Sequence, residues 1–276
     1  LCHHNNAECP LYLKTPAVRL AVDEHETALN GNAPIIYFSD ASYIKRYNAA
    51  SNSTEIIVDD LYGTITSLWI YGDRLYYTAY MGDTYDLGYI SKYGKESNVL
   101  ERKNSDVVCR IIGFYNDSLI YSDDLMSFYS VDLALNAEKL LLQTNCYATG
   151  IIQNGVLYFC NDQIETAYGN TIFQTCSLYK YDLSKGLNAI PDKIQDNILA
   201  APTPMIFKAD GDYLLYNQSS PVKVNTITIT DESNNPVDYD IFDSGSKKMY
   251  YYNMSTSETG ILFNDMGGNL SRFYYA

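Results

Sequence analysis

An internal repeat constrains this chain more than any other feature of its sequence. A short polar turn, an apolar anchor and an aromatic residue two positions further on recur five times, with the aromatic residues at Tyr37, Tyr77, Tyr121, Phe159 and Tyr216. A looser sixth copy ends at Tyr275, and successive aromatic residues are 40, 44, 38, 57 and 59 positions apart. The turns contain pairs such as Asn-Gly and Gly-Asp, which tolerate positive φ and favour tight hairpins.

A second pattern follows each of the first five copies. It consists of an apolar residue, two variable positions, a residue that is usually tyrosine and a turn former, as in Ile44 to Asn48 and Leu178 to Asp182. Apolar runs before the tight turn and after the second pattern add two further strands. Four short strands at a period of about 40–50 residues are typical of a β-propeller blade.

We therefore predict an all-β chain, a β-propeller of four-stranded blades. The blades fall near residues 31–60, 65–102, 107–143, 147–197 and 205–264, and residues 269–276 begin a further blade. Strands in the N-terminal segment 1–30, around Leu11 to Leu13 and Val18 to Val22, are expected to close that last blade. This favours six blades, with seven as the alternative. A β-sandwich is the competing architecture, and residues 192–199 form the best helix candidate.

Composition excludes several classes of function. The chain has 276 residues, 28 of them tyrosine, which favours strands and half-exposed surfaces. Its net charge of −14 argues against binding to nucleic-acid backbones or anionic membranes. No run approaches 18 apolar residues, so no transmembrane helix is predicted. Because the chain starts without methionine and stops within a strand-like run, we expect a mature or excised piece of a longer protein.

Catalytic motifs are missing from the sequence. All three histidines lie before residue 26, and neither a Gly-x-Ser-x-Gly elbow, a P-loop nor a dinucleotide fingerprint occurs. Paired carboxylates could serve a carbohydrate-active enzyme, a glycosidase or lyase. With 33 acidic residues, however, some pair will always lie at a suitable distance. The sequence therefore favours a non-catalytic protein and keeps this enzyme as the alternative.

Three runs resemble degenerate YWTD repeats of lipoprotein-receptor propellers: Ile36 to Asp40, Leu75 to Thr78 and Ile120 to Asp123. The tyrosine-rich form more closely resembles a family of bacterial propellers for which no reaction is established. That family occurs on secreted proteins and lipoproteins of gut Firmicutes and is similar to TolB-type propellers. The opening Cys2 to Leu13 looks like its cysteine-histidine-cysteine segment. The resemblance implies an extracellular or cell-surface location. The repeat, the tyrosine-rich composition and the missing catalytic motifs favour a binding or scaffold role.

Blade topology predicts where a ligand would bind. Loops between second and third strands share one rim, and three long ones, 79–87, 162–175 and 218–246, would crowd it. Alternating side chains in the third loop predict a hairpin that turns at Glu232 to Pro236. We predict that this rim binds a protein, peptide or glycan; a solvated rim with a merely decorative hairpin is the alternative. The candidate ligand-binding residues are Tyr85, Asp86, Asp162, Tyr168, Tyr239 and Asp240.

Cysteines and acidic residues suggest further sites. Six cysteines in an extracellular context permit disulfides, with Cys2–Cys9 preferred and Cys160–Cys176 as a second candidate pair. A buried thiol is the alternative for Cys160, which lies in an apolar run. Cys2, His4 and Cys9 are residue types that bind Zn²⁺, and the acidic rim could hold Ca²⁺. We predict no required cofactor, and the sequence leaves the oligomeric state open.

Overall fold

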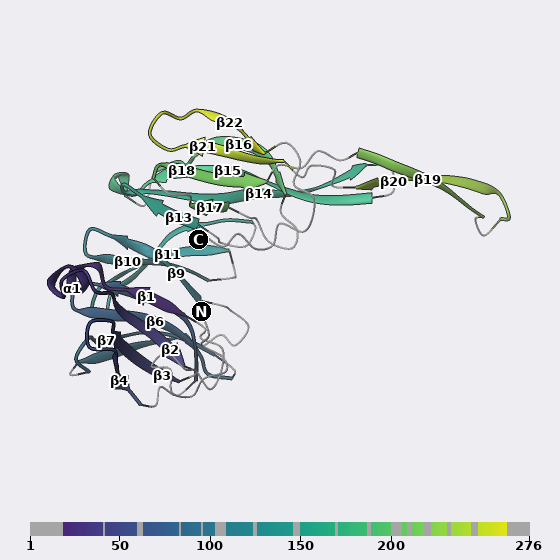
Figure 1. Cartoon of the computed structure of the whole chain (residues 1–276). Coiled ribbons are helices and arrows are strands. Elements are labelled where there is room, and N and C mark those ends of the chain that lie inside the picture. The colour runs from purple at the N-terminus through teal and green to yellow at the C-terminus, as the bar shows by residue number, and fades with distance from the viewer. Residues whose placement is uncertain are drawn as a thin grey trace. The chain divides into compact units, whose positions relative to one another are not determined.

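The structure is a computed structural model. It describes residues 19–263 except 41, 60–62, 83, 95, 103–108, 124–125, 146–149, 169–170, 187–188, 200–205, 209–210, 218–221, 231–232 and 244–247. The described residues form five four-stranded antiparallel sheets, each with its strands in an up-and-down order, and one separate two-stranded ribbon (Figure 1). The predicted all-β class is confirmed. The expected start of a last blade at 269–276 and the strand around Leu11 lie outside the described residues.

The chain divides into two compact units, residues 1–140 and 141–276. The first unit holds three sheets, and β12 crosses the boundary between the units. These sheets consist of β1 (Leu20–Val22), β2 (Ile35–Asp40), β3 (Tyr43–Asn48) and β4 (Ser53–Val58); β5 (Thr64–Tyr71), β6 (Arg74–Tyr80), β7 (Tyr85–Ser91) and β8 (Ser97–Arg102); and β9 (Cys109–Tyr115), β10 (Ser118–Asp123), β11 (Ser127–Asp132) and β12 (Glu138–Gln143).

The second unit holds two sheets and the ribbon. Their strands are β13 (Gly150–Gln153), β14 (Val156–Tyr168), β15 (Thr171–Asp182) and β16 (Asp192–Leu199); β17 (Ile206–Lys208), β18 (Tyr213–Asn217), β21 (Met249–Asn253) and β22 (Thr259–Phe263); and, in the ribbon, β19 (Val222–Thr230) and β20 (Pro236–Asp243). The described helical segments are α1 (Glu24–Leu29) and a 3-10 turn, η1 (Leu183–Lys185).

The repeat aromatic residues form the centre of each sheet. Each lies on the second strand of its sheet, at Tyr37, Tyr77, Tyr121, Phe159 and Tyr216, and none is more than 3% exposed. These second strands are covered on both faces, which explains why they read as nearly continuous apolar runs. Outer strands such as β4 and β12 are mostly exposed and carry charged residues.

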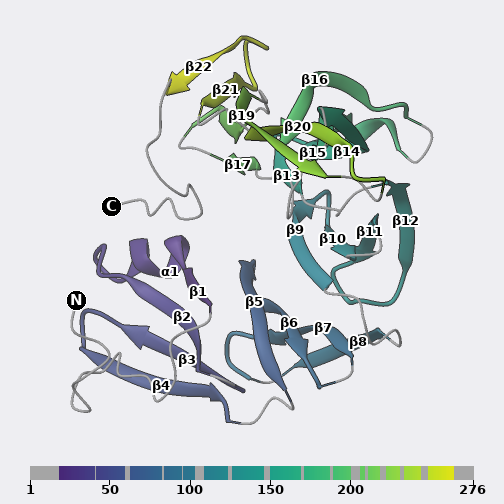
Figure 2. The ribbon, with the colours of Figure 1, turned by 90° about the vertical axis from the view of Figure 1, so that its right-hand side faces the viewer.

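Tight turns join first to second strands in the third and fourth sheets, as the sequence predicts, whereas residues 23–34, which include α1, join β1 to β2 in the first sheet (Figure 2). Asn116 and Asp117 both have positive φ between β9 and β10, and so do Asn154 and Gly155 between β13 and β14. Two consecutive residues of positive φ match the twist of a two-residue hairpin. The residues of these two turns therefore favour the first hairpin of the third and fourth sheets.

Two strand assignments differ from the sequence prediction. Residues 192–199 form strand β16 rather than a helix, because they pair with β15 and place Ile198 in the core at 0% exposure. An eight-residue segment has too few turns for helical periodicity to distinguish it from a strand. Leu20 to Val22 pair with β2 as the first strand of the first sheet, rather than helping to close a last blade.

The hydrophobic core lies between consecutive sheets within each unit. One cluster joins the first and second sheets through Ile35, Tyr37 and Leu75, and a second cluster joins the second and third sheets through Tyr76 and Tyr121. In the second unit, the fourth and fifth sheets meet around a cluster described by its largest members, Tyr158, Tyr216 and Tyr252. Each sheet thus buries apolar side chains against a neighbouring sheet of the same unit.

Gly88 shows how tightly these sheets are built. It pairs with Tyr77 across β6 and β7, and a Cβ atom there would lie 2.4 Å from the Tyr77 ring carbon Cζ. The Tyr77 side chain is buried, and burial raises the pKa of its hydroxyl to about 12. The ring therefore occupies the space that a side chain at residue 88 would need.

We predict that Gly88→Ala lowers the unfolding free energy by about 1–3 kcal/mol, the usual range for overpacking a core. Urea denaturation of the purified chain would measure it. In a Tyr77→Leu background the same substitution should cost less than about 0.5 kcal/mol, because the clashing ring is gone. An equal loss in both backgrounds would show that the Tyr77 ring is not the cause.

Candidate functional site

Two clusters of polar side chains in the first unit surround helix α1. Asp23 caps it: the Asp23 side chain accepts a hydrogen bond of 2.9 Å from the Glu26 amide. The spacing Asp-x-x-Glu is a helix-start signal that the sequence analysis did not use. Glu24 and Glu26 lie in the first turn, where acidic side chains interact favourably with the helix dipole. A six-residue helix therefore forms at a place where the sequence analysis predicts none.

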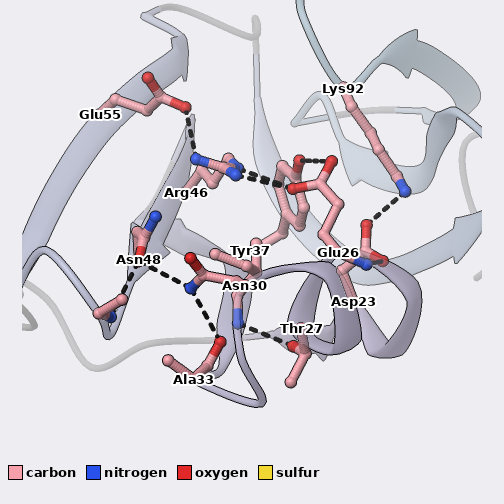
Figure 3. Close-up of polar contacts among 12 residues, drawn as sticks. Asp23, Glu26, Thr27, Asn30, Ala33, Tyr37, Arg46, Asn48, Glu55 and Lys92 are labelled. Carbon is pink, nitrogen blue, oxygen red and sulfur yellow. Dashed lines mark hydrogen bonds and ion pairs between the residues drawn. The ribbon is translucent and has the colours of Figure 1, made fainter.

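A buried ion pair fastens α1 to the second sheet. Lys92, in the turn between β7 and β8, donates from Nζ to the Asp23 carboxylate, and the two side chains are 6% and 2% exposed (Figure 3). Burial by itself opposes ionisation of Asp23, but the hydrogen bonds from the Glu26 amide and from Lys92 outweigh it. The pKa of Asp23 is consequently lowered.

A second polar cluster fastens α1 to the first sheet. Arg46 on β3 donates to Glu26 through Nη2 at 2.8 Å and Nε at 3.1 Å, and through Nη1 to Glu55 at 3.1 Å. The Tyr37 hydroxyl donates to the other Glu26 oxygen at 3.4 Å, so Arg46 links Glu26, Tyr37 and Glu55 in one polar cluster beside α1 (Figure 3). Burial, followed by the nearby Glu26 charge, raises the pKa of Tyr37. Both charges of the Arg46–Glu26 pair are thus satisfied within the protein.

A cavity of about 700 Å³ lies beside α1. Its walls come from α1, from the β5–β6 turn with Asp73 and from the β7–β8 turn with Lys92 and Tyr93. A smaller hollow of about 240 Å³ shares Glu26, Leu29 and Tyr93 with it. The volume would hold a small molecule. Its Asp23, Lys92 and Glu26 groups, however, form ion pairs with protein partners, so they stabilise the fold instead of presenting a reactive centre.

The predicted Tyr85 and Asp86 lie away from this cavity. Both begin β7, next to the Met81–Thr84 turn, whereas the cavity adjoins the turn at the other end of β7. The Tyr85 ring packs against Tyr80 with 5.0 Å between centroids, and Asp86 pairs in register with Ala79. The cavity was not predicted from the sequence because α1, which forms one of its walls, was not predicted.

Asp162 and Tyr168 lie on the same long hairpin but at different positions along it. Asp162 has positive φ at a bulge in β14, accepts a hydrogen bond from the Tyr179 hydroxyl and lies 3.6 Å from Lys193 Nζ. Tyr168 pairs with Thr171 at the tip of the β14–β15 hairpin. Six positions of extended strand separate the two residues by about 20 Å, so they do not form a single compact site.

Tyr239 and Asp240 lie on strand β20 of the predicted hairpin, which the structure confirms as a ribbon. As neighbours on a strand they point to opposite faces. Asp240 accepts hydrogen bonds from Lys223 Nζ at 2.6 Å and Thr226 Oγ1 at 2.8 Å, and these lower its pKa. Asp240 therefore holds the two strands of the ribbon together, while Tyr239 belongs to the other, more apolar face.

The candidate disulfide Cys160–Cys176 is wrong. Both residues are buried cysteines outside any disulfide, and the Cys176 thiol lies 3.7 Å from the carbonyl of Ile198. Cys160 pairs with Leu178, not with Cys176, so the two cysteines are offset by two residues across the strands. Diagonal neighbours lie about 7–8 Å apart, too far for a disulfide. Cys2, His4 and Cys9 lie outside the described residues.

The described acidic groups give no sign of a metal centre or of an acid catalyst. Within the part of the chain that the structure describes, no three His, Cys, Asp or Glu side chains are grouped to hold a metal ion. Four described carboxyl groups have a displaced pKa, and in each case it is lowered: Asp23, Asp182, Asp196 and Asp240. A glycosidase acid requires a raised pKa, which none of these four has.

Comparisons with known proteins concern the fold. No protein-family model matches the sequence, and no curated protein matches it either. Among solved structures, the chain is similar to the tricorn protease with a TM-score of 0.52 and 12% identity over 79% of this chain, and it spans a fifth (20%) of that chain. It is also similar to a putative TolB from Agrobacterium tumefaciens, with a TM-score of 0.50 and 11% identity over 85% of this chain and 78% of the TolB chain.

These likenesses establish the fold. The function has to be argued from the side chains of the candidate site. The chain has the all-β propeller fold class, and the likeness to TolB agrees with the TolB-type part of the resemblance stated above. One fold can host many different functions, so the likeness in fold does not identify an activity for this chain. None of the described helices is long and apolar enough to cross a membrane.

We predict that Asp23→Asn lowers the unfolding free energy by about 3–5 kcal/mol at neutral pH, because it leaves the Lys92 ammonium buried without a counter-charge. Asparagine can still cap α1, so the loss reports the charge. Adding Lys92→Met should restore part of the stability. Urea denaturation would measure both variants, and a loss below about 0.5 kcal/mol for Asp23→Asn would contradict a structural role for the pair.

The same pair predicts a pH dependence. Because the pKa of Asp23 is lower in the folded than in the unfolded chain, the unfolded chain takes up the proton first as the pH falls. The stabilisation is therefore complete above the usual value of 3.8 and disappears as the pH drops through the lower folded-state value. The stability difference between the wild type and Asp23→Asn should shrink over that range.

Proposed function

We propose that this chain is a non-catalytic binding or scaffold module that recognises a protein, peptide or glycan through the strand ends carrying residues 79–87, 162–175 and 218–246. The support comes from the elements at those ends. The β14–β15 hairpin is longer than its sheet requires, and the β19–β20 ribbon is an insertion between two sheet strands (Figure 1). Neither extension is needed to complete a four-stranded sheet.

The ribbon is the observation that carries this proposal. Its strands pair from Val222 and Asp243 to Thr230 and Pro236, and residues 223–230 are all exposed. One face is apolar, with Ile227 opposite Tyr239 and Ile229 opposite Val237. Ile227 and Ile229 are 41% and 46% exposed. Contiguous exposed apolar surface of this kind commonly marks a binding site.

Aromatic residues at these strand ends suit a glycan as well as a polypeptide. Tyr80 and Tyr85 form a ring pair at the end of β6 and β7, and Tyr80 is 39% exposed. In the second unit, the ribbon carries a ring of its own, that of Tyr239. Tyrosine offers a large contact area with little loss of side-chain entropy and adds a hydroxyl for hydrogen bonding.

The carbohydrate-active enzyme remains the competing proposal, and the described carboxyl groups do not favour it. The acidic groups of the predicted site are engaged in structural roles: Asp162 with Tyr179 and Lys193, and Asp240 with Lys223 and Thr226. Glycosidic cleavage needs two carboxyl groups that face one another across the sugar. We therefore propose binding without turnover.

The proposed location is extracellular or at the cell surface of a bacterium, on a secreted protein or lipoprotein. The support is the resemblance of the tyrosine-rich repeats to propellers of gut Firmicutes, together with the acidic composition. A secreted binding module would meet its glycan or protein ligand directly. The proposal names no metal or cofactor, because none of the described site residues requires one.

We predict that replacing residues 222–243 with a short glycine-serine turn abolishes ligand binding and leaves the sheets folded. A glycan array and a random peptide display library, screened with the wild type, would supply the ligands. The trimmed chain should lose at least tenfold in affinity for these ligands, while its melting temperature changes by only a few degrees.

Parallel reducing-end assays on the array oligosaccharides decide between the two proposals. We expect no release of reducing ends. Release by the wild type would establish the enzyme instead. Full retention of binding by the trimmed chain would show that the ligand does not bind through the ribbon.

A further inference from the structure

The outer edge of strand β19 is an unprotected β-edge. In the described part of the chain β19 is hydrogen-bonded to one strand only, β20. On the other side of the ribbon, β20 contacts β15 of the long hairpin. The backbone N–H and C=O groups along the outer side of β19 therefore form a row that a further strand could pair with.

Most of β19 lacks the residues that discourage such pairing. Its one charged residue, Lys223, lies near its start and forms an ion pair with Asp240 of β20. Residues 224–230 read Val-Asn-Thr-Ile-Thr-Ile-Thr, six of seven β-branched, without charge, glycine or proline. The outer strands of the five four-stranded sheets all differ. Four carry charges, among them Glu55, Glu101, Lys139 and Lys193, and the fifth, β22, has only five residues. Proteins normally protect edges with charges or by keeping edge strands short, so the nine-residue β19 stands out as an open edge.

Resting on the binding role proposed above, we infer that β19 binds an extended segment of a partner protein as an added strand. This mode of recognition takes its affinity from backbone hydrogen bonds and its specificity from alternate side chains. The added segment would extend the ribbon from two strands to three. A two-stranded hairpin alone is marginally stable in water, so the third strand would also stabilise the ribbon.

The two faces of the ribbon define the chemistry of the partner segment. The polar face carries Thr226 Oγ1–Asp240 and Thr228 Oγ1–Asp238 hydrogen bonds of 2.8 and 2.7 Å. The apolar face carries Ile227 and Ile229. Because side chains alternate along a strand, every second residue of the partner would be apolar and the intervening residues would be polar.

Charge sets the identity of those polar residues. Residues 222–243 contain one lysine and five acidic residues, a net charge of 1 − 5 = −4, in a chain of net charge −14. Basic residues on the partner would therefore be attracted to this ribbon. The same charge opposes pairing with a second copy of the chain, whose ribbon also carries −4. The partner is a segment with alternating apolar and basic residues.

The test uses a nine-residue capped peptide of alternating lysine and valine, with its binding measured by calorimetry at low salt. The control peptide carries N-methyl groups on all of its backbone nitrogens. These keep the charge and the side chains but remove the donors along both edges. We expect the unmodified peptide to bind the wild type at least tenfold more tightly than the methylated one. Equal affinities, or no binding of the unmodified peptide, would overturn the inference.

Matched variants locate the site. Ile227→Lys should weaken peptide binding at least tenfold, because it places a like charge in the apolar row. Ile261→Lys is the control, since Ile261 is similarly exposed, at 48%, on the outer strand β22. Equal effects of the two substitutions would overturn the assignment to β19. Dimers in sedimentation that Ile227→Lys dissolves would also overturn it, in favour of a second copy.

The outcome separates this inference from the broader proposal. If the ribbon-trimmed chain loses its display-selected ligands while the two peptides bind equally, the binding role stands and strand addition fails. If the trimmed chain keeps its ligands, the ribbon is not the binding element and both statements fail.

Discussion

The structure depends on one constraint: a four-stranded antiparallel sheet with an apolar face cannot bury that face alone. Here the cover is the neighbouring sheet. Tyr37 and Leu75 meet between the first and second sheets, and Tyr158 and Tyr252 meet between the fourth and fifth. The aromatic residue that repeats along the sequence sits on the second strand, which is covered on both faces. Stability therefore resides between the sheets, and the ends of the strands are free to vary.

Two strand ends have been elaborated in different ways. At one end of the first unit, the chain inserts α1 and ties it down with Asp23–Lys92 and with Glu26–Arg46. These charges are satisfied internally, so this insertion adds stability rather than chemistry. In the second unit, the chain inserts the β19–β20 ribbon, whose apolar residues Ile227 and Ile229 remain exposed. This second insertion adds surface rather than core, which is why it carries the proposed binding role.

The fold was predictable because its signals are local. Turn pairs such as Asn154-Gly155 and the alternation around Ile227 indicate hairpins from adjacent residues alone. The missed features depend on partners distant in sequence. Residues 192–199 form a strand because they pair with the edge of β15, and the offset of Cys160 from Cys176 follows from the register between β14 and β15. Predicting the cavity would have required knowing that α1 packs beside Lys92. The Asp23-x-x-Glu26 spacing could, however, have revealed where the helix starts. Within the predicted site, the ribbon that carries Tyr239 could be predicted from the alternating sequence pattern. The structural roles of Asp162 and Asp240 could not, because their partners Tyr179 and Lys223 are identified only by the folded structure.

Hydrogen exchange of the unliganded chain, resolved to single strands, tests the central claim that the ribbon lies outside the cooperative core. We expect amides of the buried strand β18 to exchange only through global unfolding. Amides of β19 should exchange about a hundredfold or more faster, because its outer edge is open to water. Addition of the lysine-valine peptide should then slow exchange in β19. Protection of β19 equal to that of β18 without any ligand would mean that this edge is already covered, which would contradict its role as a binding edge.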